Sequence, residues 1–503
     1  MRVLFVICSA LLAYTNVFAN PNNISQYFNA IKTQPEQLAS FLQAMPKGAD
    51  LHLHPSGATY AENLIQYAHG DELCIDRQTF VVYESPNCDP ANQLDNAVKE
   101  VDFYNQVIDA WSMRNFQSTT ETKHDHFFAA FGKYNIITKK HRFNVLAEVA
   151  QRAQSQNESY LEVLATGDGN ESGQLGKKLG WNSNFETMRA NLLAHDFDKI
   201  IHHISKSIDE DETHVQSILN CKASPLNNGC TIKIRYLYQV YREQAPEMVF
   251  SQLLAGFEAA SQDKRVVGLN MVQPEDGLIS MRDYSLQMQM VGFLHRLYPH
   301  VPISLHAGEL TESLVPSEGI KFHINEAVRI ANANRIGHGV DVMEENDPEQ
   351  LLKEMSKRGV LVEINLSSNF ITLPGIGDNH PLPTYLQFQV PIALSTDDEG
   401  ISRTNLTQEY MLAVNKFNLD YETLKTFARN SLTYSFLPGA ALWADNQYKE
   451  VALECQHDQL GSKDISMACQ TFLNKHEKAN LQWDLEGRFN RFEQQVITQA
   501  PLL

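Results

Sequence analysis

Short apolar runs recur along the chain, and each is followed by a longer polar or helix-like stretch. The runs are rich in β-branched residues and are too short for helices, so the pattern predicts strands. They span residues 50–54, 160–164, 232–238, 266–271, 303–306, 335–338, 361–365 and 392–397. Eight strands separated by helix-length segments are what a closed (β/α)8 barrel requires. The pattern therefore predicts an α/β fold, a (β/α)8 TIM barrel with N-terminal and C-terminal helical additions.

The barrel prediction divides the chain into segments. Residues 20–48 form a predicted N-terminal helical extension, residues 49–405 form the barrel, and residues 406–503 form helices that pack on it. Long insertions follow the first strand and precede the third, and each carries two cysteines. Hydrophobic residues make up 43% of the 503 residues, which is enough for a large core, and no repeat or proline-rich linker separates folded halves.

The first residues have the pattern of a signal peptide. Arg2 supplies a positive start, residues 3–13 are mostly apolar, and residues 17–19 (Val-Phe-Ala) resemble a cleavage site. The apolar run is too short to span a membrane, and no later stretch has the roughly 18 apolar residues that a span needs. We therefore expect removal of residues 1–19 and a secreted or periplasmic mature protein without a membrane partner.

Cysteine usage agrees with export. Cys8 falls within the predicted signal peptide, and the other six cysteines form three locally separated pairs without a CxxC motif. Six cysteines allow many pairings, so the sequence leaves the connectivity open. Sequential pairing is the simplest arrangement, because each bond would close a short loop in an oxidising compartment. It would join Cys74 to Cys88, Cys221 to Cys230 and Cys455 to Cys469.

The net charge bears on the class of ligand. The chain has 60 acidic and 41 basic residues, a formal net charge of -19. Such a surface repels phosphate backbones, so we expect a small-molecule substrate and no nucleic-acid partner.

Ionisable residues gather where four of the predicted strands end. The motifs are His52-Leu53-His54 on the first strand, His306-Ala307-Gly308-Glu309 on the fifth, His338 on the sixth and Asp397-Asp398 on the eighth. Barrel enzymes build their active sites at the carboxyl ends of the strands. Each motif alone is also explained by a turn or a helix cap, but four such coincidences are much less probable than one. Three histidines and a carboxylate form a ligand set for a divalent metal, and imidazole favours zinc.

These motifs resemble those of a known family. The stretches MPKGADLHLHPSGA, SLHAGE, RIGHGV and STDDEG are similar, in order, to the motifs of the adenosine deaminase family. The MPKG lead-in and the exported, cysteine-bearing chain look most like its secreted growth-factor-type branch and bacterial relatives. The resemblance runs from Met45 to Gly400, about seven-tenths of the chain.

The resemblance implies a role for each motif residue. It makes His52, His54, His306 and Asp397 the ligands of one Zn²⁺ per chain. A bound metal lowers the pKa of water so that hydroxide forms near neutral pH.

Three further roles follow from the same resemblance. His338 would orient that water and help to deprotonate it, with Asp397 assisting. Glu309 would protonate purine N1, and Asp398 would hydrogen-bond purine N7. The implied reaction is hydrolytic deamination of adenosine or deoxyadenosine to the inosine nucleoside and ammonia, in purine salvage or removal of adenosine. The secreted branch also suggests a homodimer.

Two departures from the family pattern affect the substrate side. The family commonly has an aspartate near the position of Ser56, so Ser56 and Gly57 are substrate-binding candidates with a weaker contact to the sugar. Gln273 replaces a family glycine whose backbone amide meets purine N3, and its side chain could crowd the pocket. The stretches 367–369 and 380–381 are interpreted as loop architecture first and ligand contacts second.

Two alternatives remain open. One is a deaminase of another purine or a modified nucleoside on the same metal site, which the departures at Ser56 and Gln273 favour. The other is a growth-factor-like binding protein that keeps the fold, against which the retention of every catalytic-type residue argues.

Overall fold

The computed structural model describes residues 24–226 and 229–499, so the predicted signal peptide lies outside the described residues. Within them, eight parallel strands form two four-stranded sheets. The first is ordered β1 (Gly48–Leu53), β4 (Glu158–Ala165), β5 (Lys233–Tyr241) and β6 (Val266–Val272). The second is ordered β10 (Ile392–Leu394), β9 (Leu361–Ile364), β8 (Arg335–His338) and β7 (Ser304–Ala307). All eight predicted strands are confirmed.

The two sheets meet at both edges and complete the barrel. Leu53 forms a parallel bridge with Asp397, and Leu269 forms one with Ile303. At the first junction the Asp397 N–H donates to the His52 carbonyl at 2.9 Å, and the His54 N–H donates to the Asp397 carbonyl at 3.1 Å. This junction joins the first strand to the end of the eighth, and so brings the two ends of the barrel sequence together.

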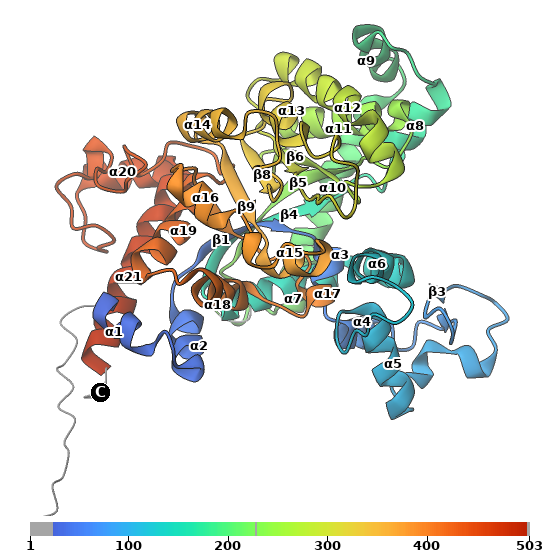
Figure 1. The fold of residues 1–503 in the computed structure, drawn as a ribbon, viewed down its shortest axis with the longest axis horizontal. Coiled ribbons are helices and arrows are strands. Elements are labelled where there is room, and N and C mark those ends of the chain that lie inside the picture. The colour runs from blue at the N-terminus through green and yellow to red at the C-terminus, as the bar shows by residue number, and fades with distance from the viewer. Residues whose placement is uncertain (1–23, 227–228, 500–503) are drawn as a thin grey trace, which may run out of the picture.

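Helices cover the outside of the barrel, as the alternating pattern predicts (Figure 1). They are α7 (Arg142–Ser155), α8 (Glu171–Leu179), α9 (Phe185–Leu193), α10 (Phe197–Ile218), α11 (Pro246–Gln262), α12 (Leu278–Leu297), α13 (His323–Arg329), α14 (Pro348–Arg358), α16 (Leu382–Gln387), α18 (Leu406–Phe417) and α19 (Tyr421–Thr433). Helix α11 packs against β5 and β6, and α19 packs against β1 and β10. Helix α19 therefore covers the junction of the first and last barrel strands, although it lies after residue 405, where the predicted barrel segment ends.

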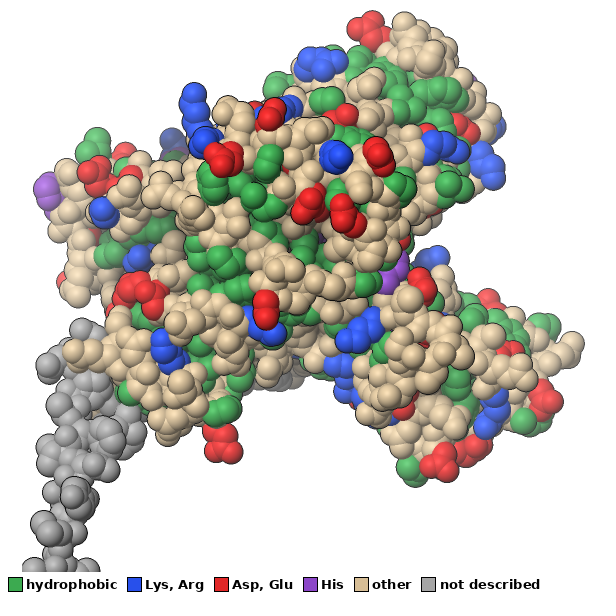
Figure 2. Space-filling view, in the orientation of Figure 1, with side chains coloured by type: hydrophobic (Ala, Val, Ile, Leu, Met, Phe, Trp, Pro, Cys, Tyr) green, Lys and Arg blue, Asp and Glu red, His purple; other side chains and the backbone are tan. Residues whose placement is uncertain are grey.

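The insertion after β1 forms a lobe with its own hydrophobic core. This insertion lobe contains α4 (Ala61–Tyr67), β2 (Cys74–Ile75), β3 (Val82–Tyr83), α5 (Val101–Trp111) and α6 (Lys123–Lys140). Its buried side chains form a cluster apart from the main barrel core. Figure 2 shows the surface indented between this lobe and the barrel, with acidic and basic side chains interspersed on the face shown.

The terminal segments lie together beside the barrel (Figure 1). Helices α1 (Ile24–Ile31) and α2 (Pro35–Ala44) confirm helical structure before the barrel. After α19 the chain is largely irregular, with a short 3₁₀ helix at Leu453–Cys455, until α20 (Met467–Lys475) and α21 (Glu477–Gln499). The described residues contain the three sequential disulfides that we expected, Cys74–Cys88, Cys221–Cys230 and Cys455–Cys469. Among the described helices, none is both long and apolar enough to cross a membrane.

Candidate active site

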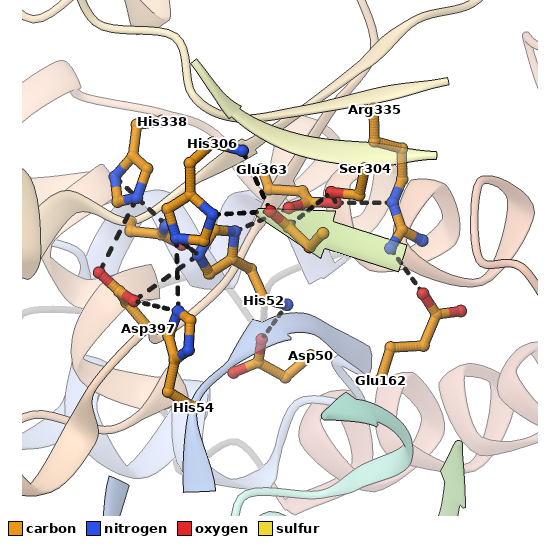
Figure 3. Close-up of polar contacts among 12 residues, drawn as sticks. Asp50, His52, His54, Glu162, Ser304, His306, Arg335, His338, Glu363 and Asp397 are labelled. Atoms are coloured by element: carbon orange, nitrogen blue, oxygen red, sulfur yellow. Dashed lines mark hydrogen bonds and ion pairs between the residues drawn. The ribbon is translucent and has the colours of Figure 1, made fainter. Parts of the chain in front are cut away.

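Four predicted ligands meet at the carboxyl end of the barrel. One ligand atom from each of His52, His54, His306 and Asp397 lies within 4.8 Å of the others, and all four residues are buried. The His306 Nε2 lies 3.0 Å from Nε2 of His52 and 3.3 Å from Nε2 of His54. Asp397 Oδ1 lies 3.6 Å and 3.4 Å from the same two nitrogens (Figure 3). The structure thus brings together side chains that lie far apart in the sequence.

Backbone turns at the strand ends direct these side chains inward. His338 ends β8 with φ 71°, and Asp397 follows β10 with φ 61°. Gln273 and Gly308, just after β6 and β7, also have positive φ, at 86° and 77°. Residues other than glycine rarely adopt this left-handed conformation, and where they do the position is often functional.

Each of the three candidate ligand histidines makes a hydrogen bond through its other ring nitrogen. The Nδ1 of His52 lies 2.8 Å from Glu363 Oε2, and the Nδ1 of His306 lies 2.8 Å from Asn270 Oδ1. The Nδ1 of His54 lies 3.2 Å from Gln239 Oε1. Because all three partners are oxygen acceptors, each Nδ1 carries the hydrogen and each Nε2 lone pair is directed at the centre.

A divalent metal fits this centre. Nitrogen lone pairs that face each other across 3.0–3.3 Å repel unless a cation lies among them. Burial and the neighbouring imidazoles lower the pKa of His306 well below its usual value, so its ring is neutral, as a ligand must be. Burial also opposes a charge on His52, but the hydrogen bond and charge of Glu363 raise its pKa. The donor set, three imidazoles and one carboxylate, is that of a metal-binding site.

A buried ion-pair network holds Glu363, the hydrogen-bond partner of His52, in position. Glu363 also accepts hydrogen bonds from Ser304 Oγ at 2.9 Å and pairs with Arg335 Nε at 2.6 Å. Arg335 pairs in turn with Glu162 at 2.6 Å (Figure 3). These charged side chains are fully buried, so each is stable there only with its partner in place. The network fixes the orientation of the Glu363 carboxylate, and through it the His52 ring.

Glu309 has the environment of a protonated carboxyl group. Burial and the nearby charges of Asp397 and Glu275 raise the pKa of Glu309 well above its usual value. Its Oε2 lies 3.7 Å from His338 Nε2, and Thr372 Oγ1 donates to its Oε1 at 3.1 Å. Glu275 accepts the backbone N–H groups of Gly308 at 3.0 Å and Glu309 at 2.8 Å, which holds the turn after β7 in place.

Asp398 is a second carboxyl group with a raised pKa. Burial and the adjacent Asp397 charge raise the pKa of Asp398 well above its usual value, and its Oδ1 has no hydrogen-bond partner among the described residues. Gly57, in the short helix α3 (Pro55–Ala58), packs directly against it: a Cβ on Gly57 would lie 2.5 Å from Asp398 Cγ. The role of Gly57 is therefore to leave room for the Asp398 side chain.

The insertion lobe closes one side of the site. Helix α6 packs against α3, α15 (Leu366–Thr372) and α17 (Glu399–Ser402), which follow the first, seventh and eighth barrel strands. Tyr134 on α6 is buried, and within the described residues its hydroxyl has no partner; its pKa is raised by burial and by the Asp398 charge. His124 Nε2 at the start of α6 lies 3.3 Å from Asp276 Oδ1, after β6.

The two departures from the family pattern have different surroundings. Ser56 is partly buried within α3, next to Gly57. Gln273 is exposed, and its Oε1 accepts the Glu243 backbone N–H at 2.9 Å. The positive φ at Gln273 explains why a glycine suits this position. The Gln273 side-chain carbonyl is hydrogen-bonded to the loop after β5.

Sequence analysis missed the residues that hold the candidate ligands and Glu309 in place: Gln239, Asn270, Glu275, Arg335 and Glu363. Four of them lie within barrel strands β5, β6, β8 and β9, and Glu275 follows β6. The available signal was a polar or charged residue inside an otherwise apolar strand, because such a residue needs a buried partner. The sequence did not show which partner that would be.

The fold and the site together define a class of protein. It is a TIM barrel whose strand ends bring a His-x-His pair, a further histidine and an aspartate together as a candidate divalent-metal site. The chain belongs to the adenosine deaminase family, because the family model described as adenosine deaminase matches residues 101–442.

Curated relatives are matched over part of their length. Adenosine deaminase of Clostridium perfringens is 32% identical over 136 residues, which are 27% of this chain and 37% of the relative. N6-methyl-AMP deaminase of Danio rerio is 30% identical over 234 residues, which are 45% of this chain and 61% of the relative. The match therefore spans less than two thirds of either relative.

Solved structures share the fold. The apo structure of the N6-methyl-AMP deaminase from Arabidopsis thaliana has a TM-score of 0.52 at 20% identity and covers 80% of this chain and 94% of that chain. An adenine deaminase from Arthrobacter aurescens has a TM-score of 0.50 at 15% identity and covers 78% of this chain and 94% of that chain. These likenesses confirm the TIM-barrel architecture.

Proposed function

We propose that this protein hydrolytically deaminates a 6-aminopurine nucleoside, adenosine or deoxyadenosine, with one zinc ion per chain. The observation that carries the proposal is the meeting of four metal-ligand atoms with two carboxyl groups of raised pKa, Glu309 and Asp398, at one end of the barrel. A metal bound there supplies Lewis acidity, which lowers the pKa of water and provides a nucleophile near neutral pH.

The protonation states of the two carboxyl groups suit a purine. Ring atoms N1 and N7 are both hydrogen-bond acceptors, and they lie on either side of the amino-bearing carbon C6. A carboxylate would repel such atoms, whereas a protonated carboxyl group donates to them. Burial and neighbouring charges raise the pKa values of Glu309 and Asp398, which favours the protonated, hydrogen-bond-donating form of both groups. Proton donation from Glu309 to N1 makes C6 electrophilic, and water then displaces ammonia.

A related substrate is the second candidate. The departures at Ser56 and Gln273 lie on the substrate side, and relatives include an N6-methyl-AMP deaminase and an adenine deaminase. The same metal site and carboxyl groups serve any purine with an amine or methylamine leaving group at C6. Which of these purines is the substrate then depends on the contacts that the pocket makes with a sugar or a phosphate.

The test is product release by the purified mature protein. Adenosine, deoxyadenosine, adenine, AMP, N6-methyl-AMP and guanosine are each incubated with zinc-loaded and metal-stripped protein, and ammonia and methylamine are measured. Metal-dependent turnover fastest on adenosine or deoxyadenosine supports the proposal. Preference for N6-methyl-AMP or adenine moves the substrate to the second candidate, and no turnover of any of them contradicts both.

We also propose an extracytoplasmic location after removal of residues 1–19. The three disulfides support it, because such bonds persist in oxidising compartments and are rare in the cytosol. Fractionation of cells that express the full chain, with sequencing of the mature N-terminus, tests both points. The homodimer stays a prediction, which light scattering of the mature protein tests.

A further inference from the structure

His338 lies at the end of a chain of buried hydrogen bonds that begins at a backbone group. The backbone N–H of Leu382, at the start of α16, lies 3.2 Å from His380 Nδ1. His380 Nε2 lies 3.2 Å from Asn369 Oδ1, and Asn369 Nδ2 lies 2.9 Å from His338 Nδ1. Asn369 on α15 and His338 are fully buried, and His380 is 2% exposed.

The direction of every bond in this chain follows from its first member. A backbone N–H only donates, so His380 Nδ1 must accept. Burial lowers the pKa of His380 to about 3, so its ring is neutral and carries its single hydrogen on Nε2. The Asn369 atom that faces Nε2 must then be the carbonyl oxygen, which leaves the Asn369 amino group facing His338.

The Asn369 amino group therefore donates to His338 Nδ1, and a neutral His338 must carry its hydrogen on Nε2. Asn365 Nδ2 lies 3.5 Å from the same Nδ1, so a second amide also faces this acceptor. The Nε2 itself has no hydrogen-bond partner among the described residues. Two carboxylate oxygens lie nearby, Glu309 Oε2 at 3.7 Å and Asp397 Oδ2 at 4.0 Å, the latter visible in Figure 3. A buried N–H without a partner is directed into the site.

We propose that Asn369 and His380 are positioning residues that hold His338 with its hydrogen on Nε2, so that His338 donates a hydrogen bond to the oxygen nucleophile. A ring nitrogen that carries a hydrogen does not accept another, so this tautomer orients water and does not deprotonate it. This role differs from the deprotonating one that the family resemblance implies, and it rests on the proposed hydrolytic deamination.

The first test reads the tautomer without substrate. Zinc-loaded protein with ¹⁵N-labelled histidine is examined by two-bond ¹H–¹⁵N correlation, and the His338 signals are assigned by their loss in His338→Gln. The expected result is an unprotonated Nδ1 and a protonated Nε2. A hydrogen on Nδ1 overturns the proposal, whatever the substrate proves to be, and so separates its failure from that of the proposed function.

The second test reverses the hydrogen bond. Asn369→Asp places an acceptor where the amino group stands, so His338 should move its hydrogen to Nδ1. Since outer partners of this kind change activity roughly 10- to 100-fold, kcat should fall at least about tenfold with KM changed much less. His380→Phe, which frees the Asn369 amide to turn over, should give a mixture of tautomers and a smaller loss. An unchanged His338 tautomer in both variants overturns the proposal.

The control variant introduces the same buried change elsewhere. Asn430 on α19 is 6% exposed, and its amino group donates to the Ile392 carbonyl. Asn430→Asp therefore tests the general cost of a buried acid without touching His338. It should leave the His338 tautomer and kcat unchanged even if thermal stability falls. A loss of kcat in this control equal to that in Asn369→Asp would show a structural effect and overturn the positioning role.

Discussion

Gly57→Ala is predicted to disable the substrate side of the site and to spare the metal. The added Cβ would lie 2.5 Å from Asp398 Cγ and 2.9 Å from its Cβ. Carbon atoms in contact lie about 3.5 Å apart, so the Asp398 carboxyl group must move by about 1 Å. A displacement of that size at a catalytic group costs roughly 100-fold, which is about 2.7 kcal/mol in the activation free energy.

The assay measures kcat/KM for nucleoside deamination, zinc per chain and the thermal midpoint of the same preparations. The matched control is Gly132→Ala on α6, where a Cβ meets nothing within 4 Å and where alanine favours a helix. The control should keep full activity, and Gly57→Ala should keep its zinc while losing activity. Activity within twofold of wild type in Gly57→Ala, at full zinc content, would refute the argument that Gly57 makes room for Asp398.

Three further predictions concern the metal and the proton donor. Glu309→Gln should keep zinc bound but lower kcat by roughly 10²- to 10⁴-fold, because it removes a proton donor and no ligand; normal turnover would exclude Glu309 from the mechanism. His306→Ala should lower zinc below one per chain by elemental analysis, and an unchanged zinc content would contradict its assignment as a ligand. Glu363→Gln should weaken zinc binding about 10- to 100-fold in chelator competition, because the His52 ring loses a charged acceptor. The control Glu354→Gln, at an exposed ion pair, should leave the zinc affinity unchanged. Equal zinc affinity in wild type and Glu363→Gln would leave Glu363 a purely structural role.

Strand positions were predictable because they depend on local sequence. An apolar, β-branched run favours a strand wherever it lies, here one of three to nine residues, and parallel strands with helices between them close into few architectures. Some ends differ: β5 continues to Tyr241, and β10 stops at Leu394 because the chain turns into the left-handed Asp397. The gathering of polar residues at one site was predictable for a related reason, since strand ends of a barrel meet on one face, and the family resemblance named the candidate ligands among them.

The partners of those ligands were decided by the tertiary structure. The sequence showed a glutamate inside β9 and an arginine at the start of β8, but their pairing with each other and with His52 depends on the register between strands. In the same way, Asn369 and His380 lie 31 and 42 positions from His338 and meet it only when α15 and α16 fold over the barrel.

The sequence by itself thus determined the fold class, which follows from patterns local to each strand, and it predicted the candidate ligand residues, which the family resemblance selects among the polar residues at the strand ends. Only the tertiary structure decided which nitrogen of each histidine faces the centre, which carboxyl groups have raised pKa values and what closes the site beside Asp398. Those properties depend on burial and on contacts between distant segments, such as α6 of the insertion lobe against α3 and α15. Burial and neighbouring charges set protonation, and neither is visible until the chain is folded.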